Sequence, residues 1–111
     1  MSSPHQIIIA SESGISIRSL TDISDVINTC IEADGLVLTE NDLAQEFFDL
    51  RTGLAGEFFQ KSINYGLRVA IVLPAPEVYG ERFSELAYEH RSHQMIRIVR
   101  SQDEATTWLS A

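Results

Sequence analysis

Residues 69–73 (VAIVL) form the most apolar run of the 111-residue chain, and this stretch decides the fold. The run shows no alternation of polar and apolar side chains, which is typical of a strand buried on both faces of a parallel sheet. Gly66, shortly before it, is a residue type that commonly ends a helix, and residues 74–76 (PAP) force a loop directly after it. We therefore predict a central strand that the chain enters from a helix and leaves through a loop.

Four further apolar segments are predicted to be strands. Residues 7–10 (IIIA) and 15–20 (ISIRSL) flank a turn-forming, Gly-containing cluster, and this pattern predicts an N-terminal β-hairpin. Residues 36–38 (LVL) and 95–99 (MIRIV) are predicted to be buried strands that precede and follow the central run in the chain.

The segments between these strands have helical periodicity. The first helix carries one apolar stripe, formed by Ile23, Val26, Ile27, Cys30 and Ile31. We expect Thr21 or Asp22 to cap its start and Gly35 to end it. Residues 41–65 are predicted to be mainly helical, with a break near the Thr-Gly pair at 52–53.

Two more helices complete the prediction. A third helix follows the proline loop and carries an apolar face formed by Tyr79, Phe83, Leu86 and Ala87. Residues 101–104 (SQDE) match a capping box, with Ser101 as the N-cap and Glu104 as the third helical residue, and predict a short C-terminal helix.

The resulting element order, ββαβαβαβα, predicts one α/β domain over residues 1–111, with a mixed, mostly parallel sheet that begins with the hairpin. Alternating strands and helices imply right-handed crossovers. In open sheets of this kind, ligands and functional loops gather beyond the carboxyl ends of the parallel strands. Here those loops are residues 39–52, 74–79 and 101–103, and we expect the functional site among them.

Composition narrows the function classes. The 16 acidic side chains outnumber the 8 basic ones and give a formal net charge of -8. Such a surface repels nucleic-acid phosphates and anionic lipid, so we predict binding neither to nucleic acid nor to a membrane. The single cysteine, Cys30, and the lack of a recognisable signal peptide or membrane-spanning run favour a cytoplasmic protein.

The most unusual local string is residues 52–56 (TGLAG). In a functional interpretation, Thr52 caps a helix whose free amides could hold an anion or a phosphate carried by Thr52 itself. In a structural interpretation, Gly53 and Gly56 let a neighbouring element approach closely. On sequence alone the structural interpretation is the commoner one, and Thr52→Ala is expected to leave the fold nearly intact.

No residue set predicts a metal, another cofactor or a catalytic centre. Asp42, Glu46 and Asp49 could share one helical face, but such a stripe is usually solvated. His90 and His93 are interpreted as surface residues at a helix C-terminus, where the helix dipole favours a positive charge. Cys30 is expected to pack in the core as a small apolar side chain. Because no set of titratable side chains converges, an enzyme is the least favoured of the function classes.

Residues 46–57 (EFFDLRTGLAGE), together with 60–61 (QK) and 64–66 (NYG), resemble the bacterial family catalogued as domain of unknown function 4180. The resemblance extends over nearly the whole chain, including the central strand and the Tyr88-Glu89 pair of the third helix. This family implies no catalytic residue or cofactor.

The element order is also similar to that of the STAS domain of anti-sigma factor antagonists. In that family, the Ser or Thr before a Gly at the start of the second main helix is phosphorylated by a partner kinase. Thr52, followed by Gly53 and Leu54, occupies the corresponding place, and Asp49 precedes Thr52 by three positions where that family has two. The resemblance implies that Thr52 is a phosphoacceptor, surrounded by Asp49, Arg51, Gly53, Leu54 and Gly56.

These observations lead to one expected function and one alternative. We expect a STAS-like regulatory module that binds a protein partner, such as a kinase or regulator, and is switched by phosphorylation at Thr52. The alternative is a small-molecule or lipid-like ligand binder with an apolar cavity lined by Phe47, Phe48 or Tyr79. Aromatic side chains of the central helix, if exposed, would also allow a homodimer.

Overall fold

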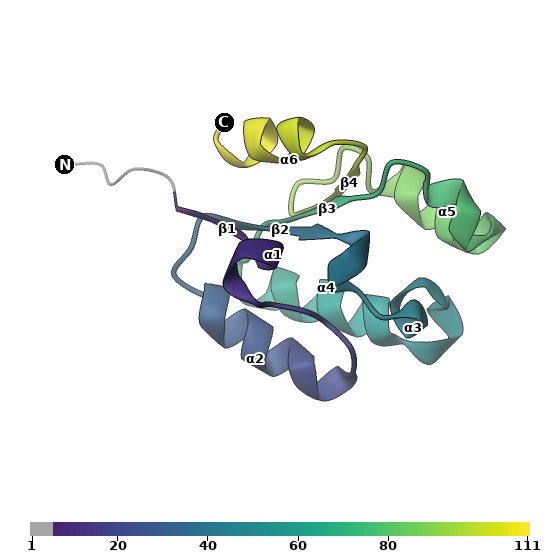
Figure 1. The fold of residues 1–111 in the computed structure, drawn as a ribbon, viewed down its shortest axis with the longest axis horizontal. Helices are drawn as coiled ribbons and strands as arrows, with labels where there is room; N and C mark the ends of the chain where they lie inside the picture. The colour runs from purple at the N-terminus through teal and green to yellow at the C-terminus, as the bar shows by residue number, and fades with distance from the viewer. Residues whose placement is uncertain (1–5) are drawn as a thin grey trace.

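The computed structural model describes residues 6–111 and has an all-parallel four-stranded sheet at its centre (Figure 1). The strands follow the chain in the order β1 (Ile7–Ile9), β2 (Gly35–Thr39), β3 (Val69–Val72) and β4 (Ile96–Val99). Every residue of β3 is buried, as the VAIVL run predicted. Its Val69 lies beside Leu36 of β2 and beside Ile96 of β4.

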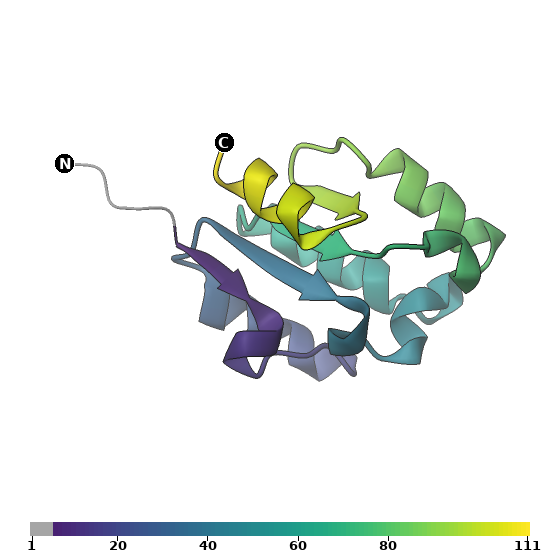
Figure 2. The ribbon, with the colours of Figure 1, turned by 45° about the horizontal axis from the view of Figure 1, so that its top comes forward.

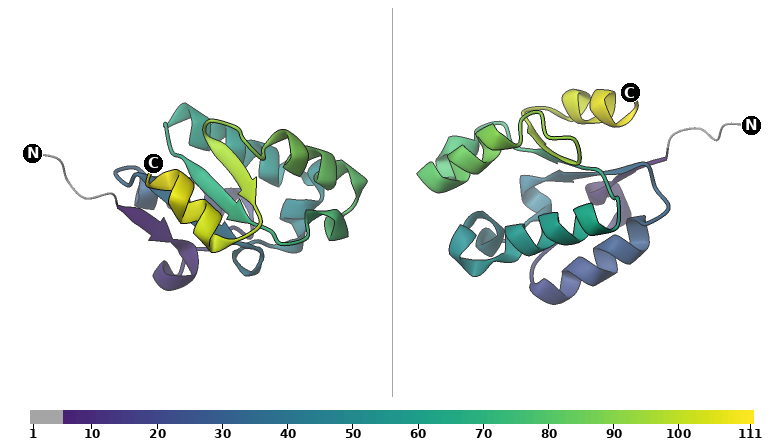
Figure 3. Two further views of the ribbon diagram at one scale, coloured as in Figure 1. Left: turned by 90° about the horizontal axis from the view of Figure 1, so that it is seen from above. Right: turned by 180° about the vertical axis from the view of Figure 1, so that it is seen from behind.

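The strand order places the helices on the two faces of the sheet unequally (Figure 3). Right-handed crossovers that step in one direction put all their helices on one face. The helices α2 (Leu20–Cys30), α4 (Leu54–Asn64) and α5 (Glu81–Glu89) accordingly contribute to one large core. Among residues 6–111, only α6 (Gln102–Leu109), the helix that follows the last strand, covers the opposite face.

The prediction of an N-terminal hairpin is wrong. After β1 the chain turns directly into the short helix α1 (Ala10–Ser13; Figure 2). This helix ends at Gly14, which is in the left-handed conformation (φ 68°). Ile17, which the alternation placed in a second strand, forms only an isolated parallel bridge with Leu43. Its amide donates to the carbonyl of Asp42 at 2.8 Å, and its side chain is fully buried. The alternating pattern thus reflects one core residue in a connecting segment.

For α2, the predicted cap residues are wrong, whereas the predicted apolar stripe is largely confirmed. Ser19 is the N-cap, and the Asp22 carboxylate accepts hydrogen bonds from the backbone amides of Arg18 (2.8 Å) and Ser19 (3.1 Å). Asp22 is thus the third helical residue, and neither it nor Thr21 is the N-cap. Four of the five expected stripe residues are buried, namely Ile23, Val26, Ile27 and Cys30.

Gly35 does not end α2 but begins β2. A Cβ built on it would lie 2.5 Å from Cδ2 of Leu109, a buried side chain of α6. The glycine is therefore required because α6 lies directly on this strand.

The segment between β2 and β3 breaks where it was expected to. It contains the 3₁₀ turns η1 (Glu40–Asp42) and η2 (Leu50–Thr52), the short helix α3 (Gln45–Phe48) and then α4. Gly53, in the left-handed conformation (φ 78°), separates η2 from α4.

Two expected helix boundaries are confirmed, namely the end of α4 and the start of α6. Gly66 is left-handed (φ 71°), and the amide of Leu67 donates to the carbonyl of Ser62 at 2.8 Å, as in a Schellman motif. The hydroxyl of Ser101 accepts from the amide of Glu104 at 3.2 Å at the start of α6. The third expected helix begins later than predicted, because Tyr79 belongs to the 3₁₀ turn η3 (Pro76–Tyr79).

The aromatic side chains of the central segment lie mostly in the core. Phe47 and Phe58 are fully buried and Phe59 is 7% exposed, so these rings cannot supply the dimer surface that the sequence suggested. The longest helices among residues 6–111, α2 and α4, have 11 residues each, and neither could cross a bilayer.

The contact between β2 and α6 can be tested by a pair of Gly→Ala variants. Gly35→Ala should lower the free energy of unfolding by about 1–3 kcal/mol, because the added methyl overlaps Leu109. Gly56→Ala is the matched control: nothing lies within 4 Å of the position of its Cβ, and it should raise stability by about 0.5–1 kcal/mol. Urea unfolding followed by circular dichroism measures both. Equal stabilities for the wild type and Gly35→Ala would contradict this packing.

Candidate functional site

A groove of about 840 Å³ lies beyond the carboxyl ends of β2 and β3. One wall comes from α3 and η2, and the other from the end of η3 and the start of α5. Figure 1 shows α3 and α5 at the same end of the sheet. Two of the three expected loops, residues 39–52 and 74–79, thus contribute to one feature, which we call the binding groove.

Three aromatic rings meet in the binding groove. Phe48 of α3 stacks on Tyr79 of η3, with ring centroids 3.8 Å apart and planes at 7°. Phe83 of α5 packs edge-on against both rings, at 5.2 Å from Phe48 and 5.7 Å from Tyr79. These contacts hold the two walls together through side chains distant in sequence.

The hydroxyl of Tyr79 donates a short hydrogen bond to the carboxylate of Glu40, which follows β2. Burial, the hydrogen bond to Glu40 and the negative charge of Glu40 together raise the pKa of Tyr79 to about 12. Tyr79 therefore stays neutral at ordinary pH and acts as a donor that joins the loop after β3 to the loop after β2.

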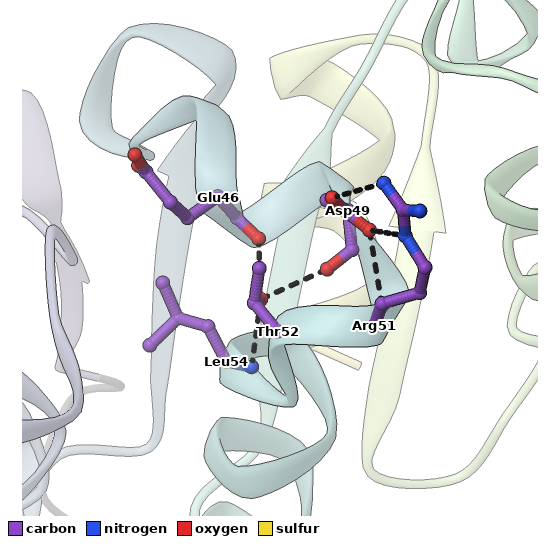
Figure 4. A network of polar contacts seen from close by, with 5 residues as sticks. All are labelled: Glu46, Asp49, Arg51, Thr52 and Leu54. Carbon is purple, nitrogen blue, oxygen red and sulfur yellow. Dashed lines mark hydrogen bonds and ion pairs between the residues drawn. The ribbon is translucent and has the colours of Figure 1, made fainter.

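Asp49 and Arg51 form a local, solvent-exposed pair on the α3–η2 wall (Figure 4). Oδ1 of Asp49 accepts from the backbone N and from Nε of Arg51, each at 3.1 Å, and Oδ2 accepts from Nη2 at 3.1 Å. The side-chain hydrogen bonds from Arg51 hold the pKa of Asp49 below its usual value, and the same bonds raise the pKa of Arg51. Most of the charge of this pair is therefore satisfied internally.

Thr52 is exposed, yet its hydroxyl organises the same wall (Figure 4). Oγ1 lies 2.7 Å from the carbonyl of Glu46 and 2.8 Å from that of Asp49, and it accepts from the amide of Leu54 at 3.3 Å. Thr52 therefore joins the end of α3 to the start of α4. Its oxygen satisfies a free amide of α4, as expected, although the N-cap residue is Gly53.

The six candidate residues separate into two groups. Asp49, Arg51 and Thr52 line the binding groove. Leu54 is a core residue, and neither Gly53 nor Gly56 lies on the groove lining. Nothing lies within 4 Å of a Cβ built on either glycine, so the close-packing interpretation of this string is wrong.

The sequence anticipated only part of the groove lining. Phe48 and Tyr79 were expected there and are found there, whereas Phe47 is buried in the core. Arg82 was missed, and Val78 was expected only as part of the loop at residues 74–79, because no local pattern links η3 to α3. The position of η3 after a parallel strand was the one available signal.

The acidic residues of this region do not converge. Asp42 is buried, and its Oδ2 accepts from the amide (2.8 Å) and hydroxyl (3.0 Å) of Thr39. Glu46 and Asp49 lie in the following elements rather than on one continuous helical face with it. Over residues 6–111, no group of three or more metal-ligating side chains could hold a metal ion.

His90 and His93 are half-buried and have structural contacts, contrary to the surface role expected for them. Nδ1 of His90 lies 2.9 Å from the carbonyl of Leu86. Nδ1 of His93 accepts from the amides of Met95 (3.0 Å) and Ile96 (3.1 Å) at the entry to β4. Because α5 ends at Glu89, His93 lies in the loop before β4 rather than in the last turn of the helix, and the dipole argument does not apply to it.

Comparison with known proteins identifies the family. Residues 2–109 match the family described as Domain of unknown function (DUF4180), and the chain belongs to it. Searches of curated proteins and of solved structures found no match. The similarity to STAS domains is not confirmed, since the hairpin on which that element order depended does not form.

The Asp49–Arg51 pair predicts a change that NMR can detect. In Arg51→Ala, the pKa of Asp49 should rise toward its ordinary value, because the hydrogen bonds that stabilise the carboxylate are lost. A ¹³C-detected titration of the Asp49 carboxyl measures this. Arg82→Ala, on the opposite wall, is the matched control and should leave the Asp49 titration unchanged. An unchanged Asp49 titration in Arg51→Ala would contradict the pairing.

Tyr79 predicts a pH dependence at the alkaline end. Its folded pKa of about 12 lies above the unfolded value of about 10, so its contribution to stability is complete below pH 10 and declines as the pH rises through 12. An absorbance titration of the tyrosines should therefore contain a late step, near pH 12, that belongs to Tyr79. Tyr79→Phe should remove the late step, and Glu40→Gln should move it to lower pH. The absence of a late step in the wild type, or its persistence in Tyr79→Phe, would overturn the assignment.

Proposed function

We propose that this DUF4180 member is a cytoplasmic regulatory module that holds an extended segment of a partner protein in the binding groove. The observation that carries the proposal is the groove itself, which is open and lies beyond the carboxyl ends of β2 and β3. This is the edge of an open parallel sheet where ligands are bound.

The lining of the groove favours a protein segment over an enclosed small molecule. Its floor contains the stacked Phe48 and Tyr79 rings, and Val78 on its rim is 70% exposed. Charged side chains of both signs surround these apolar groups, namely Glu46, Asp49, Arg51, Glu81 and Arg82. Sites for small molecules are usually enclosed and mostly apolar, whereas an apolar anchor with a polar rim is typical of protein interfaces.

The electrostatics favour a basic partner. The chain carries a net charge of -8, which attracts cationic surfaces and raises their association rate. Because Asp49 and Arg51 neutralise each other, the remaining charged side chains of the lining are Glu46, Glu81 and Arg82. Together they leave one net negative charge to meet a positive charge on the partner.

Phosphorylation at Thr52 by a partner kinase would switch this binding. A phosphate adds nearly two negative charges to the groove wall and removes the hydroxyl proton that Thr52 donates to the Glu46 or Asp49 carbonyl. Repulsion from Asp49 would further loosen the wall. The looser wall changes the shape of the groove, and the added charge strengthens its attraction for a basic partner. Neither effect depends on a STAS-like strand order.

A small-molecule or lipid-like ligand remains the second candidate. The observation that favours it is the cluster of three aromatic rings, Phe48, Tyr79 and Phe83, at one position in the groove. A flat apolar ligand could stack there in place of a partner's side chain.

The proposal can be tested by site-specific crosslinking in the native host. A photoreactive amino acid at Val78, which is 70% exposed in the groove, should capture one defined protein. The same group at Ile31, which is 50% exposed and does not line the groove, is the matched control. Equal capture at both positions, or none at Val78, would contradict a groove that binds protein.

Variants at Thr52 separate the structural role of its hydroxyl from the effect of added negative charge. Thr52→Ala should lower the free energy of unfolding by about 1 kcal/mol, since it removes the hydroxyl that holds α3 to α4. This revises the nearly neutral effect expected from the sequence. Thr52→Ser keeps the hydroxyl and should be close to the wild type. Urea unfolding measures these changes.

The captured partner, once purified, should bind Thr52→Glu at least about tenfold more tightly than Thr52→Ala, because only the glutamate adds a negative charge that attracts a basic partner. Isothermal titration calorimetry measures the two affinities. If the two variants bind equally, phosphorylation at Thr52 is not the switch.

A further inference from the structure

A second, smaller pocket of about 180 Å³ lies on the other side of the η3–α5 segment. Pro76 and Glu77 of η3 line this pocket, whereas Val78 and Tyr79, the next two residues, line the binding groove. The opposite wall comes from Leu73 and from the end of β4. We call this feature the α5 pocket.

One face of α5 forms a wall of the α5 pocket. Ser84, Ala87 and Tyr88 are spaced at i, i+3 and i+4, which places them on one side of the helix, and Arg91 follows just after the helix ends at Glu89. Together with Leu73, Pro76, Ile98 and Val99, the helix provides a mainly apolar lining. This pocket also lies beyond the carboxyl ends of parallel strands, here β3 and β4.

Two arginines line the α5 pocket in a protein where acids outnumber bases two to one. The guanidinium of Arg91 lies 4.0 Å from the centre of the Tyr88 ring and donates to the Tyr88 hydroxyl at 3.0 Å. Nη1 of Arg100 donates to the carbonyl of Pro74 at 2.9 Å. Within the described residues, neither guanidinium forms an ion pair, so both keep donors for an anion.

The charge balance of the lining indicates a ligand with one negative charge. Arg91 and Arg100 contribute two positive charges and Glu77 one negative charge. A guanidinium binds a carboxylate through paired, charge-assisted hydrogen bonds. The volume of 180 Å³ equals about six water molecules at roughly 30 Å³ each, so the apolar part of the ligand must be small.

We infer that the α5 pocket binds a small apolar group that carries a single carboxylate. The apolar part lies against Ala87, Ile98 and Val99, and the carboxylate accepts hydrogen bonds from Arg91 and Arg100. Two sources supply this chemistry: a free monocarboxylic acid of benzoate size, or the C-terminal residue of a protein chain with an apolar side chain. The site is independent of the binding groove.

An NMR titration of the full chain tests this inference. Benzoate, added up to about 10 mM, should shift the amide resonances of Tyr88, Ile98 and Val99 in a saturable way. Benzamide, which has the same shape without the charge, should bind at least about tenfold more weakly. A short N-acetylated peptide acid that ends in valine distinguishes the second source, since tighter binding than benzoate would assign the pocket to chain termini.

Arginine variants supply the control. Arg91→Gln and Arg100→Gln should each weaken benzoate binding by about tenfold, because each removes charge-assisted hydrogen bonds. Arg82→Gln changes the net charge equally but lines the binding groove, and it should leave benzoate binding unchanged. The spectrum of each variant reports whether it folds.

Three results would overturn the inference: no saturable shift with benzoate or the peptide acid, equal binding of benzoate and benzamide, or equal weakening by Arg82→Gln.

Discussion

The parallel pairing of β3 with β2 on one side and β4 on the other is the constraint on which the rest of the structure depends. A strand buried on both faces needs cover above and below, and the sequential strand order lets the crossovers provide it on one face only. The same parallel order brings the loops after β2, β3 and β4 to one edge of the sheet. The position of both pockets follows from this arrangement.

The second face of the sheet depends on one short helix and its neighbours. Helix α6 has eight residues, and its Leu109 packs so closely on β2 that Gly35 has no room for a side chain. Trp108 extends the cover, with the guanidinium of Arg68 at 4.7 Å from its ring centre and that of Arg97 at 4.6 Å. Arg68 also donates to the carbonyl of Trp108 at 2.9 Å, so it satisfies an acceptor at the end of α6. The guanidinium groups of Arg68 and Arg97 therefore pack on Trp108 and help to cover the face of the sheet on which α6 lies.

The parts of this architecture that could be predicted are those that a single segment determines. The VAIVL run, the amphipathic stripe of α2, the Ser101 cap and the left-handed Gly66 each follow from residues within one turn or one strand. The failures involve partners far away in the chain. Ile17 alternates like a strand residue, but its bridge partner, Leu43, is distant in the sequence. Gly35 was interpreted as a helix end because its contact with Leu109 cannot be deduced from neighbouring residues.

The candidate site shows the same division. The string around Thr52 could be selected from its residues, because a Thr-Gly pair between two helices has a local meaning. The opposite wall could not, because Tyr79 reaches Glu40 and Phe48 only after β3 has paired with β2. The predicted loops therefore coincide with the groove, while the chemistry of its lining depends on contacts between them.

Thr52 connects the architecture of this wall with its proposed regulation. Its hydroxyl closes the turn between α3 and α4, and the same oxygen is the atom that a kinase would modify. A phosphate there could not donate to the Glu46 or Asp49 carbonyl, so modification would alter the shape of the groove as well as its charge. A switch built this way needs no movement of the sheet, because the strands and the buried side of α4 are held by the core. Only the exposed wall, between the end of α3 and Gly53, has to change.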